Sequence, residues 1–379
     1  MHRQGLRSAK RIVVKIGTRV LVRKNGRPDI GRIESLVAQI CEAHKAPCEV
    51  VMVSSGAIGA GIEAMRMTGR PTSLPELQMA AAVGQSRLMT RYDQCFKAHD
   101  TSIGQVLLTR DDLRHRTRHL NARNTMLTLL RNRIVPIVNE NDVIAVDEIK
   151  LGDNDILAAL VTLLIGADAL ILLSSVDGLR EPLASGRTRR VPHLERVDDD
   201  ALAMISEKTD ELSTGGMATK LEAARMVAHT GAAAVIADGR KNGILNQILG
   251  GKDVGTLIGS SNLTDERALR SRKKWIAYFH RKEGELHIDE GAKEALVLKG
   301  KSLLPIGIKQ VTGDFGVGAM VDIKSNHKSV ARGLVDYSSR QIRKIKGQRT
   351  SEIARILGSR DYDEVIHRDN MVIIHEPSR

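Results

Sequence analysis

The sequence predicts an α/β protein whose mostly parallel sheet is sandwiched by helices and is followed by a small β-barrel-like domain. From residue 10 to residue 258, short apolar runs alternate with stretches of helical periodicity, as expected of parallel strands buried on both faces. Beyond this region come short strands with short helices between them. A polar, charged stretch separates the two patterns. We therefore expect a first domain at 1–259, a linker at 260–274 and a second domain at 275–379.

In the first domain, strands are expected where short apolar runs are bounded by polar residues. These runs lie at 11–16, 49–53, 102–108, 134–138, 169–173 and 232–237. Helices are expected where the apolar residues follow a helical period. These segments lie at 29–44, 77–98, 120–132, 156–165, 199–206, 213–229 and 243–249. The polar segment 180–196, which contains two prolines, predicts a loop.

The second domain shows shorter elements of both kinds. Strands are expected at 285–288, 319–323 and 329–337, and helices at 290–298, 339–345 and 351–357, and the chain closes with the segment 371–375. Aromatic residues make up only 2% of the chain, so both cores must be built from aliphatic side chains. The same scarcity argues against base stacking as the main binding device.

Charge and cysteine content set broader limits. The formal net charge of +13 permits anionic ligands or nucleic acid without choosing between them. The three cysteines, Cys41, Cys48 and Cys95, show no CxxC spacing and are expected to be reduced thiols in a cytoplasmic protein. No apolar run reaches the roughly eighteen residues of a membrane span. We therefore expect no membrane partner.

Two polar clusters follow the apolar run 134–138. The first is Asn139-Glu140-Asn141-Asp142, and the second, 150–155, leads into an apolar helix. Ligands of open α/β sheets bind at the carboxyl ends of strands, where such residues are expected. Asp153 and Asn154 are both candidates to cap the helix. Each cluster alone is also typical of a turn, so the functional interpretation depends on finding the two together.

Two lysines lie where positive charge could meet phosphate. Lys15 is near the end of the first predicted strand, two residues before Gly17, and Lys220 lies in the first turn of a helix that opens with Thr214-Gly215-Gly216. Neither segment fits GxxxxGK[ST], so a P-loop is excluded. The pattern GxGxxA at 59–64 gives only weak support to a dinucleotide site. The histidines lack ligand spacing, so no protein-held metal site is expected.

Taken together, these segments resemble the amino acid kinase family, in particular its members that act on glutamate. The matching segments are VVKIGT (13–18), SSGAIGAG (54–61), AAVGQSRL (81–88), LLTRDDL (107–113), LNARNT (120–125), IVPIVNEND (134–142), EIKLGDND (148–155) and TGGMATKLEAA (214–224). They cover nearly the whole first domain and imply the amino acid kinase fold. Segments 289–315 and 352–358 resemble the PUA domain, a module that binds RNA in other proteins.

The resemblance implies transfer of the γ-phosphate of ATP, with Mg²⁺, to the side-chain carboxylate of L-glutamate, the first step of proline synthesis. It also implies feedback inhibition by proline and assembly as a homodimer or homotetramer. A glutamate carboxyl, whose pKa is about 4.3, is already ionised at neutral pH and needs no general base. The obstacle is repulsion between two anions, which lysines and Mg²⁺ can reduce.

Roles follow from the same resemblance, residue by residue. Lys15 and Lys220 would stabilise the transferring group, and Asp155 would orient them. The glutamate would be held by Ser55, Gly56, Asn139, Asp142 and Asn154, with Lys150 and Asp153 nearby. ATP would contact Lys15, Gly17, Ser174, Ser175, Thr214, Gly215, Gly216, Met217, Ala218, Thr219 and Lys220.

The chain departs from the family pattern on the nucleotide side. Ser174-Ser175 stands where the family usually has Thr-Asp, Glu211 and Ser213 replace two glycines, and the segment after Gly178 lacks the usual Tyr-Thr-x-Asp-Pro. Two alternatives therefore stay open. One is a related kinase acting on another small acid or on carbamate. The other is an RNA-binding or regulatory protein that retains an inactive kinase domain.

Overall fold

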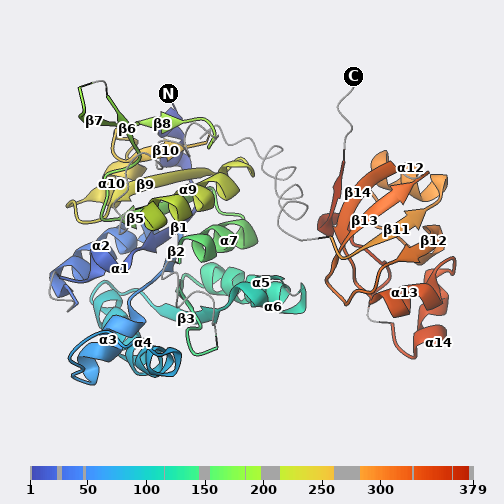
Figure 1. Ribbon diagram of the computed structural model, residues 1–379, viewed down its shortest axis with the longest axis horizontal. Helices are drawn as coiled ribbons and strands as arrows, with labels where there is room; N and C mark the ends of the chain where they lie inside the picture. Colours follow the sequence, from blue (N-terminus) through green and yellow to red (C-terminus); the bar gives the residue numbers. More distant parts are fainter. Residues whose placement is uncertain are drawn as a thin grey trace. The chain divides into compact units, whose positions relative to one another are not determined.

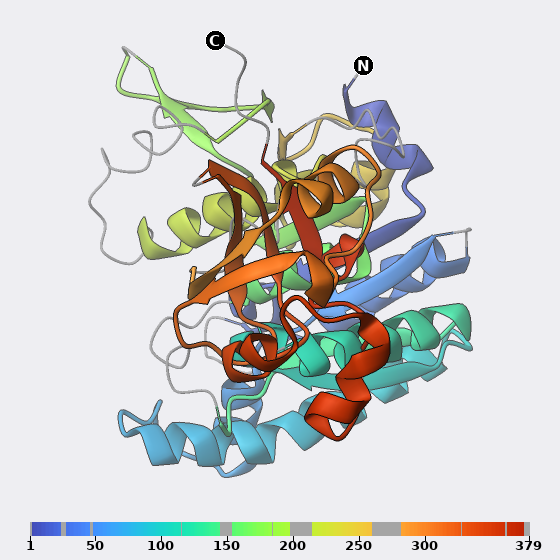
Figure 2. The same ribbon diagram turned by 90° about the vertical axis from the view of Figure 1, so that its right-hand side faces the viewer.

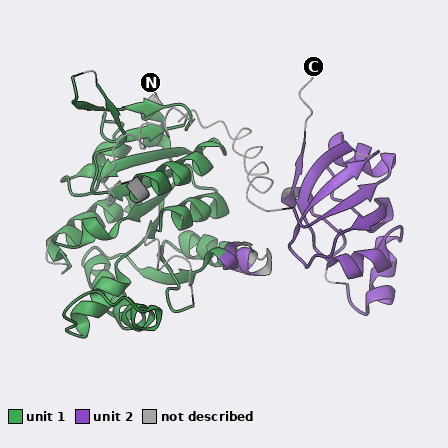
Figure 3. Ribbon diagram, viewed as in Figure 1, with its two compact units in different colours: residues 1–110, 122–268 green, residues 111–121, 269–379 purple. Residues whose placement is uncertain are grey.

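The computed structural model describes residues 2–23, 28–45, 48–114, 116–144, 154–183, 185–197, 214–259, 282–326, 328–360 and 362–374. The chain divides into two compact units, residues 1–110 with 122–268 and residues 111–121 with 269–379 (Figure 3). The expected linker, 260–274, lies outside the described residues, and the domain boundaries stay a prediction.

The first unit is built on an eight-stranded sheet with the order β3-β4-β2-β1-β5-β9-β10-β8 (Figure 1). Its strands are β1 (Arg11–Ile16), β2 (Glu49–Val53), β3 (Ile103–Leu108), β4 (Val135–Glu140), β5 (Ala169–Ser174), β8 (His193–Leu194), β9 (Ala233–Asp238) and β10 (Thr256–Ile258). All neighbours pair in parallel except β9 and β10. The predicted mostly parallel sheet is confirmed.

Helices cover both faces of this sheet. One face packs on α2 (Ile30–Lys45), α4 (Leu74–Lys97) and α10 (Ile244–Leu249), and the other on α7 (Asp155–Ile165) and α9 (Thr214–Ala228). Side chains alternate between the faces of a strand. Ile12, Val14 and Ile16 belong to the core beneath α2 and α4, so Val13 and Lys15 face α7 and α9.

The remaining helices of the chain up to β4 are short, apart from one. They are η1 (His2–Ser8), α1 (Thr18–Leu21), α3 (Ala57–Ala64), α5 (Arg110–Arg114) and the longer α6 (Arg116–Arg131). Of these, only α6 was predicted from helical periodicity, because a helix of one or two turns is too short to show a period.

Helices α3 and α4 cross at unusually close range. A Cβ atom on Gly61 would lie 1.8 Å from the carbonyl oxygen of Ala80, and one on Gly84 would lie 1.8 Å from that of Ala57. Only glycine permits such backbone contact. The start of α3, which directly follows Ser54-Ser55-Gly56, is therefore held against the middle of α4.

The prediction of a loop over 180–196 was wrong. Strands β6 (Arg180–Pro182) and β7 (Thr188–Arg190) form an antiparallel pair, and β8 follows them. Glu181 lies opposite Arg189 and the two side chains form an ion pair of 2.5 Å. Such an exposed, charged pair of strands lacks the apolar alternation by which strands are recognised. The helix predicted at 199–206 lies outside the described residues.

The second unit contains a five-stranded sheet with the order β12-β11-β13-β14-β15. Its elements are β11 (Gly284–Ile288), α12 (Glu290–Val297), η2 (Pro305–Gly307), β12 (Ile308–Thr312), β13 (Met320–Ser325), β14 (Lys328–Leu334), α13 (Ser339–Ile345), η3 (Thr350–Glu352), α14 (Ile353–Leu357), η4 (Arg368–Asn370) and β15 (Met371–Ile373). Figure 2 shows these strands, orange to red, curving together. The sequence missed β12, whose exposed face is polar.

The second unit has its own core. Leu286, Val321, Ile323 and Ala331 from the strands are fully buried together with Ile342 and Ile353 from the helices. Helix α13 begins with a capping box formed by Ser338 and Gln341. Among the described helices of both units, none is long and apolar enough to span a membrane.

Candidate active site

The centre of the first unit is a buried carboxylate that contacts two lysines. Lys15 Nζ lies 2.7 Å from Asp155 Oδ1, and Lys220 Nζ lies 2.8 Å from Asp155 Oδ2. The three residues come from the end of β1, the first residue of α7 and the second turn of α9. Strand alternation directs Lys15 toward these two helices, which explains how residues far apart in the sequence meet.

Burial makes the charge balance of this group important. The side chains of Lys15 and Asp155 are 2% and 0% exposed, and that of Lys220 is 8% exposed. Two ammonium groups share one carboxylate, so this trio carries a net positive charge. Buried charge is unfavourable unless it is paired. An anionic ligand placed beside the two ammonium groups would be attracted by both.

The predicted nucleotide-binding segments meet near this group. The Gly17 N–H donates to Leu173 O at 2.9 Å, which ties the end of β1 to the end of β5, next to Ser174. Helix α9 begins at Thr214, and Lys220 Nζ donates back to Gly216 O at 2.9 Å. Thr219 Oγ1 lies 3.3 Å from Asp155 Oδ2. Glu211 and Ser213, two of the departures from the family pattern, lie outside the described residues.

Arg240 is a cation on this side that sequence reasoning missed. It donates to Ser175 O at 2.7 Å and forms an ion pair of 2.9 Å with Asp238 at the end of β9. Burial raises the pKa of Asp238, but the hydrogen bonds from Arg240 outweigh that effect and the net pKa lies below the usual value. Positive charge thus lies beside the Ser174-Ser175 departure.

The other side of the site is the loop after β2. Gly56 adopts a left-handed conformation with φ of 100° directly before α3, which suits glycine at this turn. Ser54 and Ser55 are buried. Ser54 Oγ lies 2.8 Å from the hydroxyl of Tyr92 on α4, and burial raises the pKa of Tyr92 to about 12. The loop is therefore held by a neutral tyrosine.

A chain of side-chain amides joins the two polar clusters. Asn154 Nδ2 donates to Ser54 O at 2.6 Å and to Asn139 Oδ1 at 2.8 Å. Asn139 Nδ2 in turn donates to Gln85 Oε1 at 2.7 Å. Of the two candidates to cap α7, Asp153 lies outside the described residues and Asn154 stands at the cap position. The side chain of Asn154 makes no cap bond, and its amide nitrogen donates to Ser54 O and Asn139 Oδ1.

Asp142 lies in the turn after β4 and is half-buried. Burial raises the pKa of Asp142 to about 6, and the positive charge of Arg70 opposes that rise. A cationic ligand group beside this carboxyl would favour its ionised form. Lys150 and Asp153, which were also expected near the site, lie outside the described residues.

No protein-held metal site is formed by the described part of the chain, which contains no group of three or more His, Cys, Asp or Glu able to hold a metal ion. Both oxygens of Asp155 are within 2.8 Å of an ammonium nitrogen. An added cation would be repelled there.

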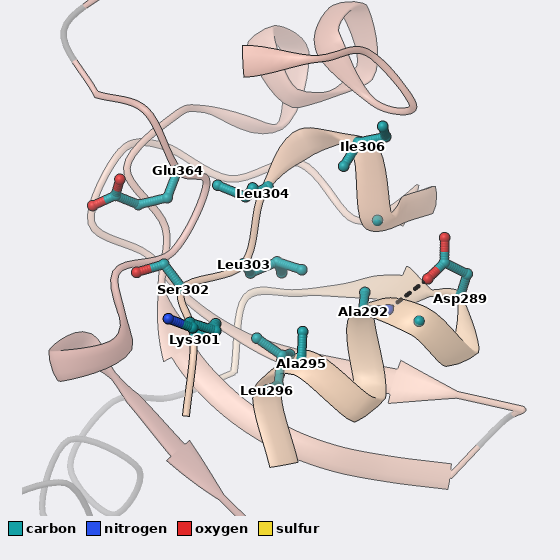
Figure 4. A pocket seen from close by; sticks show the side chains of 12 residues that line it. Asp289, Ala292, Ala295, Leu296, Lys301, Ser302, Leu303, Leu304, Ile306 and Glu364 are labelled. Atoms are coloured by element: carbon teal, nitrogen blue, oxygen red, sulfur yellow. Dashed lines mark hydrogen bonds between the residues drawn. The ribbon is translucent and has the colours of Figure 1, made fainter. Parts of the chain in front are cut away.

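The second unit carries a pocket of its own, with a volume of about 660 Å³ (Figure 4). Its lining is largely apolar, including Leu296, Leu303 and Ile306. The charged groups are two carboxylates, Asp289 and Glu364, and one ammonium group, Lys301. Asp289 is engaged as the cap of α12, where it accepts from Ala292 N at 2.7 Å. This charge balance does not favour a phosphate-rich ligand.

Comparison with known proteins adds independent findings. The model of the amino acid kinase family matches residues 10–238, and that of the PUA domain matches residues 284–357. The chain is similar to the glutamate 5-kinase of Moorella thermoacetica, with 43% identity over 375 residues, or 98% of each chain. It is also similar to the glutamate 5-kinase of Geobacter sp. strain M21, with 44% identity over 377 residues, or 99% of this chain and all of the other.

Solved structures give more distant similarity. The carbamate kinase of Giardia lamblia bound to AMP-PNP has a TM-score of 0.48 and 20% identity, and covers 67% of this chain and 99% of its own. The UMP kinase of Bacillus anthracis has a TM-score of 0.45 and 16% identity, and covers 67% of this chain and 97% of its own.

Proposed function

The chain belongs to the amino acid kinase family, and on this premise we propose that it transfers the γ-phosphoryl group of ATP to the side-chain carboxylate of L-glutamate. The product is L-glutamyl 5-phosphate, an acyl phosphate that serves proline biosynthesis as its first intermediate. The glutamate 5-kinases of M. thermoacetica and Geobacter, which align over nearly the full chain, support the choice of acceptor.

The observation that carries the proposal is the pair of buried ammonium groups on Asp155. Phosphoryl transfer to a carboxylate must bring two anions into contact, and charge accumulates on the equatorial oxygens in the transition state. Lys15 and Lys220 supply fixed positive charge in a place from which water is largely excluded, where its effect is strongest. Asp155 holds both lysines, one on each carboxylate oxygen.

The reaction needs no proton transfer. A γ-carboxylate oxygen of glutamate attacks the γ-phosphorus, the bond between that phosphorus and the β,γ-bridging oxygen breaks, and ADP leaves with the bridging oxygen. The acceptor is already ionised, because its pKa of about 4.3 lies well below neutrality. Mg²⁺ bound to the phosphates of ATP supplies further charge neutralisation when the nucleotide binds.

We assign the acceptor side to the loop after β2 and the amide chain. The ammonium group of glutamate is placed beside Asp142, whose raised pKa then returns toward its usual value. Ser55, Gly56, Asn139 and Asn154 surround the rest of the molecule. Lys150 and Asp153 are assigned to the same side from the family resemblance alone.

We assign the nucleotide to the opposite side of the lysine pair. Gly17, Ser174 and Ser175 lie at the ends of β1 and β5. Segment 214–220 offers the N-terminus of the fifteen-residue helix α9, where unpaired N–H groups and the helix dipole favour phosphate. Arg240, whose guanidinium donates to Ser175 O, offers a positive charge beside Ser174-Ser175, where the family usually has Thr-Asp.

One regulatory proposal follows from the chemistry of the acceptor side. Proline carries a positively charged nitrogen next to an α-carboxylate, as glutamate does, so we propose that it inhibits by competing beside Asp142. From the family resemblance we also propose that the protein forms a homodimer or homotetramer and is cytoplasmic. Proline inhibition that is competitive against glutamate but not against ATP is the expected kinetic pattern.

The direct experiment is trapping of the acyl phosphate. Purified protein with Mg-ATP and L-glutamate should form a hydroxamate in the presence of hydroxylamine, together with one ADP for each turnover. Aspartate, N-acetylglutamate and carbamate form the comparison panel. If no hydroxamate forms from glutamate across a range of pH and metal conditions, the proposal is rejected. If the protein phosphorylates another acid more efficiently, that acid is the acceptor and not glutamate.

RNA binding by the second unit is the alternative function. It rests on the PUA family match, whereas the charge of the pocket in Figure 4 does not support it. Binding to RNA would show as a mobility shift that weakens steeply with added salt. Such a shift in a protein without phosphoryl transfer would favour the alternative over the kinase.

A further inference from the structure

The side-chain amide of Gln85, on α4, belongs to the acceptor side, and only one of its two polar atoms has a hydrogen-bond partner among the described residues. Its oxygen accepts a hydrogen bond from Asn139 Nδ2 at 2.7 Å. Its nitrogen, Nε2, is buried and has no hydrogen-bond partner among the residues that the structure describes. Buried amide N–H groups in native proteins are nearly always paired, because an unpaired one destabilises the fold. A donor left open in this way calls for an acceptor.

The orientation of the Gln85 amide is determined by its neighbours. The carbonyl of Ser54 can only accept, so Asn154 must turn its nitrogen toward it, at 2.6 Å. The second hydrogen of that nitrogen reaches Asn139 Oδ1 at 2.8 Å. Asn139 must then turn its own nitrogen toward Gln85, which must present its oxygen. Rotating the Gln85 amide by 180° would place two N–H₂ groups against each other.

The chain of amides also gives the open donor a position relative to the reacting groups. Asn154 directly precedes Asp155, which holds the two lysines. From Asn154 the hydrogen bonds lead through Asn139 to Gln85, so two side-chain amides separate Gln85 from the residue next to that charge centre. A bound glutamate must place its γ-carboxylate at the lysines in order to react. Its α-carboxylate lies at the other end of the molecule.

We propose that Gln85 Nε2 donates a hydrogen bond to the α-carboxylate of bound glutamate, which makes Gln85 a specificity-determining residue. Binding then pairs the open donor with an anionic acceptor. The proposal rests on the proposed function, since it takes glutamate as the acceptor molecule. Helix α4 is suited to this role, because its close contact with α3 fixes Gln85 against the loop at 54–56.

The substitution Gln85→Glu distinguishes a role in substrate binding from a purely structural role. Gln85→Glu keeps an oxygen to accept from Asn139 Nδ2 but replaces the open donor by an anionic oxygen. Binding of L-glutamate, measured by calorimetry, should weaken about ten- to a hundredfold, while binding of ATP should stay within about twofold. Gln94→Glu, an exposed position on the same helix, makes the same change of charge and serves as the matched control.

A second substrate makes the test sharper. L-Isoglutamine, the α-carboxamide of glutamate, offers an N–H₂ group that can donate to the carboxylate introduced by Gln85→Glu. The preference of the wild-type protein for glutamate over isoglutamine, as a ratio of kcat/KM, should therefore fall at least about tenfold in this variant. If Gln85 served only the hydrogen bonding of the fold, the substitution would lower kcat/KM for both substrates by the same factor and leave their ratio unchanged.

The outcomes are separable. An unchanged ratio, or an affinity for glutamate within about twofold of the wild type in folded Gln85→Glu, overturns the proposal. A wild-type protein that binds glutamate but forms no hydroxamate rejects the proposed function, while the calorimetric comparison still decides the role of Gln85. A wild-type protein that does not bind glutamate overturns both. Thermal unfolding of each variant shows whether it is folded.

Discussion

Replacing Lys220 by methionine tests whether the second ammonium group serves catalysis rather than stability. The side chain is 8% exposed, and its Nζ lies 2.8 Å from Asp155 Oδ2. Methionine is unbranched and of similar length, so it fills the same space. The substitution leaves Asp155 paired with Lys15 at 2.7 Å, and the buried group becomes neutral overall.

The expected magnitudes differ widely for the two properties. Removal of one preorganised donor to a transition-state anion costs about 100- to 1,000-fold in kcat. Stability should change by no more than about 1 kcal/mol, because an ion pair is lost while an excess buried charge is removed with it. For a unit of this size that corresponds to a shift in Tm of about 2–4 °C.

The assay is hydroxamate formation at saturating glutamate and ATP, together with thermal unfolding of the free protein. Lys241→Met, an exposed lysine near the end of β9, is the control for loss of a positive charge. Lys220→Met with a kcat within about threefold of the wild type would refute the assignment of Lys220. A fall in Tm of about 10 °C or more would show instead that the ammonium group mainly holds the fold together.

Three further predictions concern other parts of the site. Asp155→Asn should lower the unfolding free energy by about 3–5 kcal/mol in a denaturant titration, because two buried ammonium groups lose their shared carboxylate; an unchanged midpoint contradicts the buried charge group. Gly84→Ala should destabilise the protein by about 1–3 kcal/mol and raise the KM for glutamate more than that for ATP, because the new methyl group pushes the start of α3 away. Equal effects on both KM values would show that α3 does not position the glutamate-binding residues. Because the pKa of Asp142 is raised to about 6, its carboxyl ionises as the pH rises through that value, and the KM for glutamate should fall from about pH 5 to about pH 7. Asp142→Asn should raise the KM and remove this pH dependence; a variant with the same pH profile as the wild type would show that another group titrates.

The sequence predicted much of the fold because its signals are local. Alternating apolar strands and periodic helices are visible within windows of ten to twenty residues, and they placed the main strands and helices of both units. The hairpin at 180–190 was missed because its short strands are exposed and charged, and α3 was missed because eight residues are too few to show a helical period. Lys15 and Lys220 could be singled out as candidate phosphate ligands by their place at element ends.

The partners of each side chain could not be read from the sequence. Asn154 was one of two candidates to cap a helix, because cap preference is a local property. It stands at the cap position, but its amide nitrogen donates to Ser54 O and Asn139 Oδ1, which no local pattern indicated. Gln85 was not singled out at all, since a glutamine inside a helix gives no local signal of a ligand. Its importance depends on the register of β2 against β4 and on the close crossing of α3 and α4.

The sequence by itself determined the order of the elements and which residues carry charge at their ends. Only the tertiary structure decided that two lysines from distant segments share the carboxylate of Asp155, and that the amide nitrogen of Gln85 is left without an acceptor among the described residues. The reason is that hydrogen-bond direction and charge pairing depend on which groups meet in space, and burial determines how strongly each unpaired group must find a partner.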